Sequence, residues 1–171
     1  DAQESRGLGD VYKRQIEDHF DNAYEIESQL LGTSKEHYLK EIKEVIKKST
    51  FTYVRQKQML GLGDAILSGE PLIGDEPFAV HLADDLCVNS SDSVMLQMIK
   101  LYDIYQCSII AIEEVQKDQT DKYGIISGNL ITGSTDCFMV TDMVEKPPEN
   151  KAPSNMAIIG RYIPVSYTHL T

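Results

Sequence analysis

The chain has 171 residues, of which 42% are hydrophobic and 25% are charged, and its formal net charge is −11. These values indicate a folded domain of ordinary size, and the acidic balance argues against nucleic acid or an anionic membrane surface as a partner. No apolar run approaches the roughly 20 residues that a membrane-spanning helix needs.

The first part of the chain is typical of two helices followed by a short strand. Apolar residues recur at helical spacing in IEDHFDNAYEIESQLL (16–31) and again in residues 34–46. FTYVRQ (51–56) is rich in β-forming residues, and MLGLGDAILSG (59–69) indicates a glycine turn that leads into a helix.

The rest of the chain alternates between strands and helices. SVMLQMIKLYDIYQ (93–106) has the pattern of an amphipathic helix. The alternation predicts an α/β sandwich with a mostly parallel central sheet and flanking helices, in which a ligand binds beyond the carboxyl ends of the strands. The predicted strands are PFAVHLADD (77–85), SIIAIEEV (108–115), KYGIISG (122–128), DCFMVTDMVEK (136–146) and NMAIIGRYI (155–163).

The two ends of the chain interrupt these patterns. DVYKRQ (10–15) corresponds to the translation of a transposon mosaic end used in sequencing libraries, and VSYTHL (165–170) to its reverse complement in another frame. We therefore expect natural sequence from 16 to 164 only, as a domain truncated at both ends, with residues 1–15 and 165–171 derived from an adaptor.

The reactive side chains favour a reducing compartment and no covalent chemistry. Cys87, Cys107 and Cys137 are scattered and lack CxxC spacing, which predicts unpaired thiols and a cytoplasmic location. The four histidines form no recognisable triad with serine, cysteine or aspartate.

Two adjacent carboxylates follow the strand predicted at 77–85. Asp84 and Asp85 offer the hard oxygen ligands that suit Mg²⁺, an ion that keeps several waters and shares phosphate oxygens. Aspartate equally suits a helix N-cap or a turn, so the residues alone leave both interpretations open.

The glycines near the start of the helix at 59–69 suggest a place where a ligand comes close to the backbone. Gly61 and Gly63 expose N–H groups to an anion or a base, although an ordinary loop-to-helix connection would also explain them. Gln56 precedes them with an amide that offers both a donor and an acceptor to a nucleobase edge.

The segment MVEKPP (143–148) places a carboxylate and an ammonium group side by side at a strand end. Glu145 can accept hydrogen bonds from sugar hydroxyls and Lys146 can provide the charge for a phosphate, whereas an exposed charge pair is the alternative interpretation. Successive strand residues point to opposite faces, so joint use of the pair requires a bend or a strand end. Gly124, in another predicted strand, indicates a close approach by ligand or backbone.

Taken together, these pieces resemble the bacterial UTP–glucose-1-phosphate uridylyltransferase family of the sugar nucleotidyltransferases. The resemblance covers nearly all of residues 16–162 and implies a Rossmann-like nucleotidyltransferase sandwich, of which 16–164 would be a part. The fragments that carry it, in the family's order, are IEDHFDNAYEIE, VRQKQMLGLGDAIL, GDEPFAVHLADDL, MVEKP and APSNMAIIGRY.

The resemblance implies a role for each matching residue and the transfer of UMP from UTP to glucose 1-phosphate, which gives UDP-glucose and pyrophosphate with Mg²⁺ as cofactor. The parent enzyme would be a homo-oligomer. The implied roles are the uracil site for Gln56 and Gly61, the Mg²⁺ site for Asp84, glucose binding for Gly124 and Glu145, the sugar phosphate for Lys146, and the sugar pocket for Ile158 and Tyr162.

Other functions remain open at this stage. The sequence is also similar to thymidylyltransferases that use dTTP, and a non-catalytic sugar-nucleotide-binding module or a plain interaction domain would explain the same segments. The family's G-x-G-T-R loop and its C-terminal part are absent from these 171 residues. We therefore expect the isolated chain to be inactive.

Overall fold

The computed structural model of the chain describes residues 24–88 and 92–165. The chain divides into two compact units, Asp1–Lys57 and Gln58–Thr171. The proposed adaptor segments 1–15 and 165–171, apart from Val165, and the start of the helix predicted at 16–31 lie outside the described residues. Within the described ranges no helix is long and apolar enough to cross a membrane.

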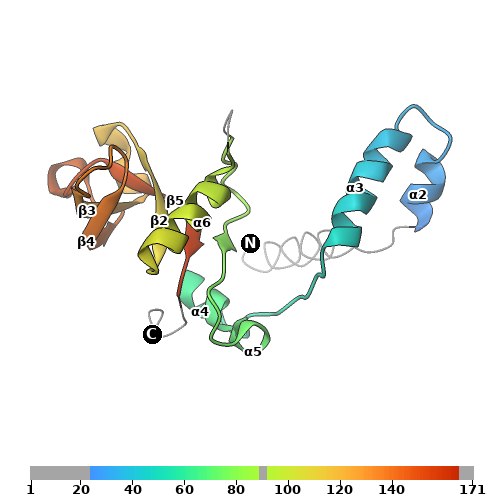
Figure 1. Cartoon of the computed structure of the whole chain (residues 1–171), viewed down its shortest axis with the longest axis horizontal. Helices are drawn as coiled ribbons and strands as arrows, with labels where there is room; N and C mark the ends of the chain where they lie inside the picture. The colour runs from blue at the N-terminus through green and yellow to red at the C-terminus, as the bar shows by residue number, and fades with distance from the viewer. Residues whose placement is uncertain (1–23, 89–91, 166–171) are drawn as a thin grey trace, which may run out of the picture. The chain divides into compact units, whose positions relative to one another are not determined.

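The first unit contains a pair of helices, α2 (Tyr24–Leu30) and α3 (Glu36–Lys48), which lie side by side in Figure 1. Gly32 has a left-handed φ of +76° in the connecting turn, and an ion pair of 2.5 Å joins Lys43 to Glu27. Both helices were predicted. The strand predicted at 51–56 is wrong, because these residues form neither helix nor strand.

The second unit begins with the short helices α4 (Leu62–Leu67) and α5 (Glu70–Ile73), followed by β1 (Val80–His81) and helix α6 (Val94–Tyr105). Four longer strands come next: β2 (Ile109–Glu114), β3 (Gly124–Leu130), β4 (Phe138–Glu145) and β5 (Met156–Ile163). The turns η1 (Lys117–Lys122) and η2 (Glu149–Lys151) precede β3 and β5 respectively. Each strand overlaps the range predicted from sequence, but β1 is shorter than expected and β3 runs two residues beyond the predicted 122–128.

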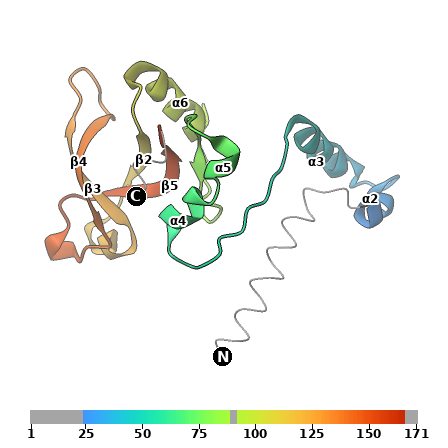
Figure 2. The same ribbon diagram turned by 90° about the horizontal axis from the view of Figure 1, so that it is seen from below.

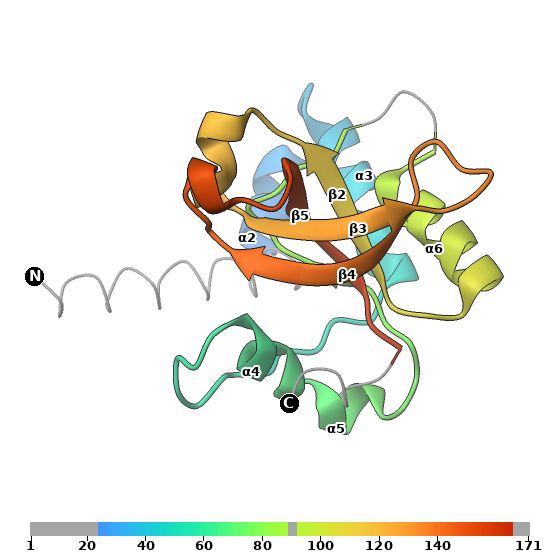
Figure 3. The same ribbon diagram turned by 90° about the vertical axis from the view of Figure 1, so that its left-hand side faces the viewer.

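Strand β5 joins all parts of the sheet. The strand order is β1-β5-β3-β4, and β2 also pairs with β5. Ala157 of β5 faces Ile125 of β3, whereas Arg161 and Tyr162 of the same strand face His81 and Val80 of β1. Figure 3 shows β3 and β4 running side by side.

The mostly parallel sheet expected from the sequence must be corrected, because all strand pairings in the described ranges are antiparallel. A short loop joins β3 to β4 directly, and such a connection cannot produce parallel neighbours, which need a long crossover. Several side chains of β4 are exposed, which an antiparallel sheet tolerates because one of its faces can meet water. The prediction of an α/β fold itself is confirmed.

The core of this unit lies between α6 and the sheet. Met98 of α6 packs in one buried cluster with Ala111 of β2 and Ile163 of β5, and Figure 2 shows α6 beside β2. Ile125 and Ala157 are fully buried where β3 meets β5. This packing fixes β5, and with it the ends of the strands that carry the candidate site.

Candidate functional site

The chain bends sharply at the end of β4. The strand ends at Glu145, and Lys146 adopts a left-handed backbone with φ of +46°, which L-residues rarely take. The Lys146 amide donates to the Tyr123 carbonyl at 3.0 Å, so the bend is tied to the start of β3. Lys146 Nζ lies 3.7 Å from a carboxylate oxygen of Glu145. The predicted strand end and bend are therefore confirmed, and the two side chains lie together.

Buried contacts hold the backbone that follows the bend. Pro147 is buried, and its carbonyl lies 3.2 Å from the hydroxyl of Thr120, a residue that is only 1% exposed. The same hydroxyl lies 3.1 Å from the Lys117 carbonyl. This anchoring supports the left-handed conformation, while the side chains of Glu145 and Lys146 stay 76% and 60% exposed to solvent.

Three residues of the predicted sugar site meet at this bend. Gly124 pairs with Glu145 across β3 and β4. A Cβ atom added to Gly124 would lie 3.2 Å from Cδ1 of Ile158 and 3.3 Å from Oε2 of Glu145. Any side chain at position 124 would therefore press on the carboxylate and on Ile158. The structure brings Gly124, Glu145, Lys146 and Ile158 together.

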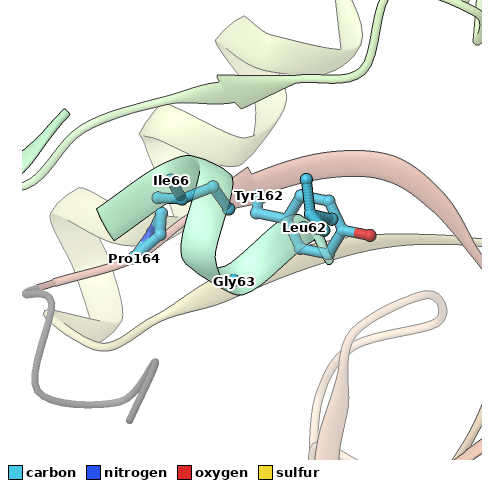
Figure 4. Close-up of a pocket in the computed structure, with 5 residues that line it drawn as sticks. All are labelled: Leu62, Gly63, Ile66, Tyr162 and Pro164. Atoms are coloured by element: carbon cyan, nitrogen blue, oxygen red, sulfur yellow. The ribbon is translucent and has the colours of Figure 1, made fainter. Parts of the chain in front are cut away.

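Tyr162 lines an open apolar pocket of about 140 Å³ between β5 and α4. In Figure 4 the Tyr162 ring lies beside Leu62, and its hydroxyl points away from Pro164. Burial raises the pKa of the Tyr162 phenol, and the charges of Asp85 and Glu145 raise it further. At neutral pH the hydroxyl therefore remains a proton donor.

Gly61, which was predicted at the uracil site, caps the start of α4 with φ of +97° and is exposed.

Asp84 lies in an exposed turn that follows β1, and its neighbour Asp85 is half-buried. Asp85 lies over Gly160 of β5, where φ is +55° and an added Cβ would collide with the Asp85 carboxylate. The guanidinium of Arg161, which is 8% exposed, donates to backbone carbonyls of the same turn, including that of Leu82 at 2.9 Å. Sequence reasoning missed Gly160 and Arg161. The available signal was a glycine and a charge inside the apolar run 155–163.

The Asp84–Asp85 turn fits a hard divalent cation. In residues 24–88 and 92–165, no three histidine, cysteine or acidic side chains gather as a ready metal site. Mg²⁺ is typically held by one or two carboxylates together with waters and substrate phosphates, so this small donor set matches its chemistry.

Gln56 and the other predicted site residues belong to different units of the chain. Gln56 belongs to the first unit, where it is half-buried in a stretch that has neither helix nor strand. The described geometry therefore does not relate it to Gly61 or to the bend at Lys146, and its place at the uracil site remains a prediction.

Known proteins are similar to this chain over most of its length. Residues 11–166 match the family model described as nucleotidyl transferase. A UTP–glucose-1-phosphate uridylyltransferase of Pseudomonas aeruginosa is 59% identical over 152 residues, which cover 88% of this chain and 54% of the relative. The chain thus spans about half the length of the curated relatives it matches.

Solved structures show the same likeness. An apo UDP-glucose pyrophosphorylase superposes with a TM-score of 0.81 at 57% identity, covering 89% of this chain and 55% of that one. A UDP-glucose pyrophosphorylase in complex with UDP-glucose gives a TM-score of 0.80 at 53% identity, with 90% and 55% coverage. The resemblance inferred from the sequence fragments is confirmed.

Replacing Lys146 should separate backbone strain from side-chain function. Glycine adopts a left-handed φ without the steric clash of a Cβ atom, so Lys146→Gly should be about 1 kcal/mol more stable than Lys146→Ala. Urea unfolding of both variants measures the difference. Equal midpoints would mean that the bend is unstrained.

His81 should make stability depend on pH. The His81 side chain is exposed at the end of β1, but partial desolvation of its ring lowers its pKa, and the nearby Arg161 cation lowers it further. A folded-state pKa below the unfolded value of about 6.5 gives a stabilisation that is fully present above pH 6.5 and is lost as pH falls through the folded-state pKa. His81→Gln should therefore lose less unfolding free energy between pH 7.5 and 5 than the parent chain. If the unfolding free energies of the two proteins changed equally with pH, His81 would not be the source of this pH dependence.

Proposed function

This chain belongs to the nucleotidyl transferase family, and we propose that the full-length enzyme containing it transfers UMP from UTP to glucose 1-phosphate. The observation that carries the proposal is the meeting of Gly124, Glu145 and Ile158 beside the left-handed Lys146. A glycine, a carboxylate and a cation at one exposed bend suit a phosphorylated sugar. The names of the similar proteins support the same substrates.

Each end of the sugar phosphate would have its own partner at the bend. Glu145 accepts hydrogen bonds from glucose hydroxyls, and Gly124 lets the sugar approach the backbone closely because it has no Cβ. Lys146 binds the phosphate as a point charge. Because the chain carries a formal charge of −11, such local positive charge is needed to hold an anionic substrate.

The reaction is an in-line displacement. A phosphate oxygen of glucose 1-phosphate attacks the α-phosphorus of UTP and forms a new P–O bond, while the bond to the β-phosphate breaks and pyrophosphate leaves. This chemistry needs alignment and charge stabilisation rather than a protein nucleophile. Asp84 would hold Mg²⁺, which offsets negative charge on the phosphates when bound.

The remaining predicted residues complete the proposed site. Gln56 and Gly61 would hold uracil, while Ile158 and the protonated Tyr162 would line the sugar pocket. The enzyme would be a cytoplasmic homo-oligomer, and its unpaired cysteines agree with a reducing compartment.

The test is a matched set of variants of the full-length enzyme that contains this sequence. Glu145→Gln and Lys146→Ala should each lower kcat/KM for UDP-glucose formation by roughly 10- to 100-fold. The first removes the charge that strengthens the hydrogen bonds to the sugar, and the second removes the cation that binds the phosphate. Glu149→Gln and Lys151→Ala are the controls, since both residues are exposed in η2 and lie just beyond the bend. Equal losses in site and control variants would refute the assignment.

The nucleotide and the catalytic role are decided in the same assay. UTP should outcompete dTTP, and a preference for dTTP would favour a thymidylyltransferase. Binding of UDP-glucose by an enzyme that shows no turnover would favour the non-catalytic module, and the absence of binding would favour an interaction domain.

The 171-residue chain alone should show no turnover, because it spans about half the length of its relatives. Pyrophosphate release in the presence of both substrates measures this. Release above that of a Glu145→Ala chain would show that the expectation is wrong.

A further inference from the structure

Strand β5 is irregular at the point where it passes the Asp84–Asp85 turn. Ile110 and Ile112 of β2 are two positions apart, yet they face Tyr162 and Ile158 of β5, which are four positions apart. The extra residues of β5 include Gly160, whose φ is +55°. A bulge of this kind re-aims the side chains beside it and is frequent next to functional sites.

The side chain that follows this glycine closes the Asp84–Asp85 turn. Nη1 of Arg161 donates to the carbonyls of Leu82 and Gly160 at 2.9 Å each, and Nη2 donates to the carbonyl of Asp85. Leu82 and Asp85 flank Asp84 in the sequence. One planar guanidinium therefore binds both ends of the turn that carries the metal-binding candidate.

A second contact fixes the same turn against β5. The Leu82 amide donates to the Gly160 carbonyl at 2.9 Å. The absence of a side chain at position 160 leaves space for Asp85, and a Cβ there would also lie 3.0 Å from Cβ of Leu82. The glycine and the arginine thus act on one turn, one by leaving room and the other by hydrogen bonding.

The burial of Arg161 separates this role from direct substrate binding. The residue is 8% exposed, and its guanidinium is occupied by backbone carbonyls. A buried charge is costly unless it is hydrogen-bonded, and a rigid guanidinium fork can bind two carbonyls at once, whereas a lysine ammonium is a single point charge.

We propose that Arg161 is a positioning residue that holds the Leu82–Asp85 turn so that the Asp84 carboxylate is presented to a divalent cation. The presence of the cation rests on the proposed function. That Arg161 holds the turn follows from its hydrogen bonds alone. Residues that orient metal ligands typically change metal affinity 10- to 100-fold when they are replaced.

The experiment compares Arg161→Gln and Arg161→Lys with Ile163→Val. Ile163 lies on the same strand and is 5% exposed, so its truncation destabilises the core without touching the turn. Hydrogen exchange is measured on the 171-residue chain, and the Mg²⁺ concentration for half-maximal rate is measured on the full-length enzyme. Arg161→Gln should accelerate exchange at residues 82–86 about tenfold more than at β3, and Arg161→Lys should recover only part of the protection.

The full-length Arg161→Gln enzyme should need about tenfold more Mg²⁺, with KM for glucose 1-phosphate changed less than twofold, and Ile163→Val should leave the Mg²⁺ requirement unchanged. If Arg161→Gln left hydrogen exchange at residues 82–86 unchanged, or if Ile163→Val accelerated it equally, Arg161 would not hold the turn. If Arg161→Gln accelerated exchange but left the Mg²⁺ requirement unchanged, Arg161 would hold the turn without affecting cation binding. If the unmodified enzyme forms no UDP-glucose, the proposed function fails, and the exchange data still decide whether Arg161 holds the turn.

Discussion

The site depends on the way that β5 pairs with its neighbours. Near its start, Ala157 meets β3, and near its end, Arg161 and Tyr162 meet β1. The bend at Lys146 is tied to the start of β3, and the Asp84 turn follows β1. Strand β5 therefore sets the positions of both the Glu145–Lys146 bend and the Asp84–Asp85 turn. Because α6 and β2 pack against the same strand, the core supports both ends at once.

Two cations near the candidate site, Lys146 and Arg161, differ in burial and in hydrogen-bond partners. In a chain with 27 acidic and 16 basic residues, an anionic ligand depends on a few well-placed cations. Lys146 is exposed beside Glu145, so its ammonium group can reach a ligand phosphate. Arg161 is buried instead, and its hydrogen bonds go to carbonyls.

Much of this architecture could be predicted because it depends on local patterns of residues in the sequence. The periodicity of apolar residues predicted α3 and α6. Strands β2, β4 and β5 lie within the expected ranges, and β3 runs two residues beyond its range. The Glu145–Lys146 pair predicted a bend because the two side chains would otherwise point to opposite faces of the strand. The strand predicted at 51–56 does not form, because β propensity alone does not decide whether a segment joins a sheet.

The rest depends on contacts that no local pattern contains. The direction of strand pairing is set by which strands meet, and the run 155–163 reads as an ordinary strand although it is bulged at Gly160. Arg161 acts on Leu82 and Asp85, which are more than 70 positions away in the chain. A lone arginine in an apolar run signals a buried partner, but it does not say which one.

A crystal structure of the full-length enzyme with UDP-glucose and Mg²⁺ would test the proposed site most directly. We expect the Glu145 carboxylate on glucose hydroxyls, the Lys146 ammonium on a phosphate, and Mg²⁺ at Asp84 with Arg161 still bound to the Leu82 and Asp85 carbonyls. A ligand that leaves the Glu145–Lys146 bend in contact with solvent alone would contradict the proposed site.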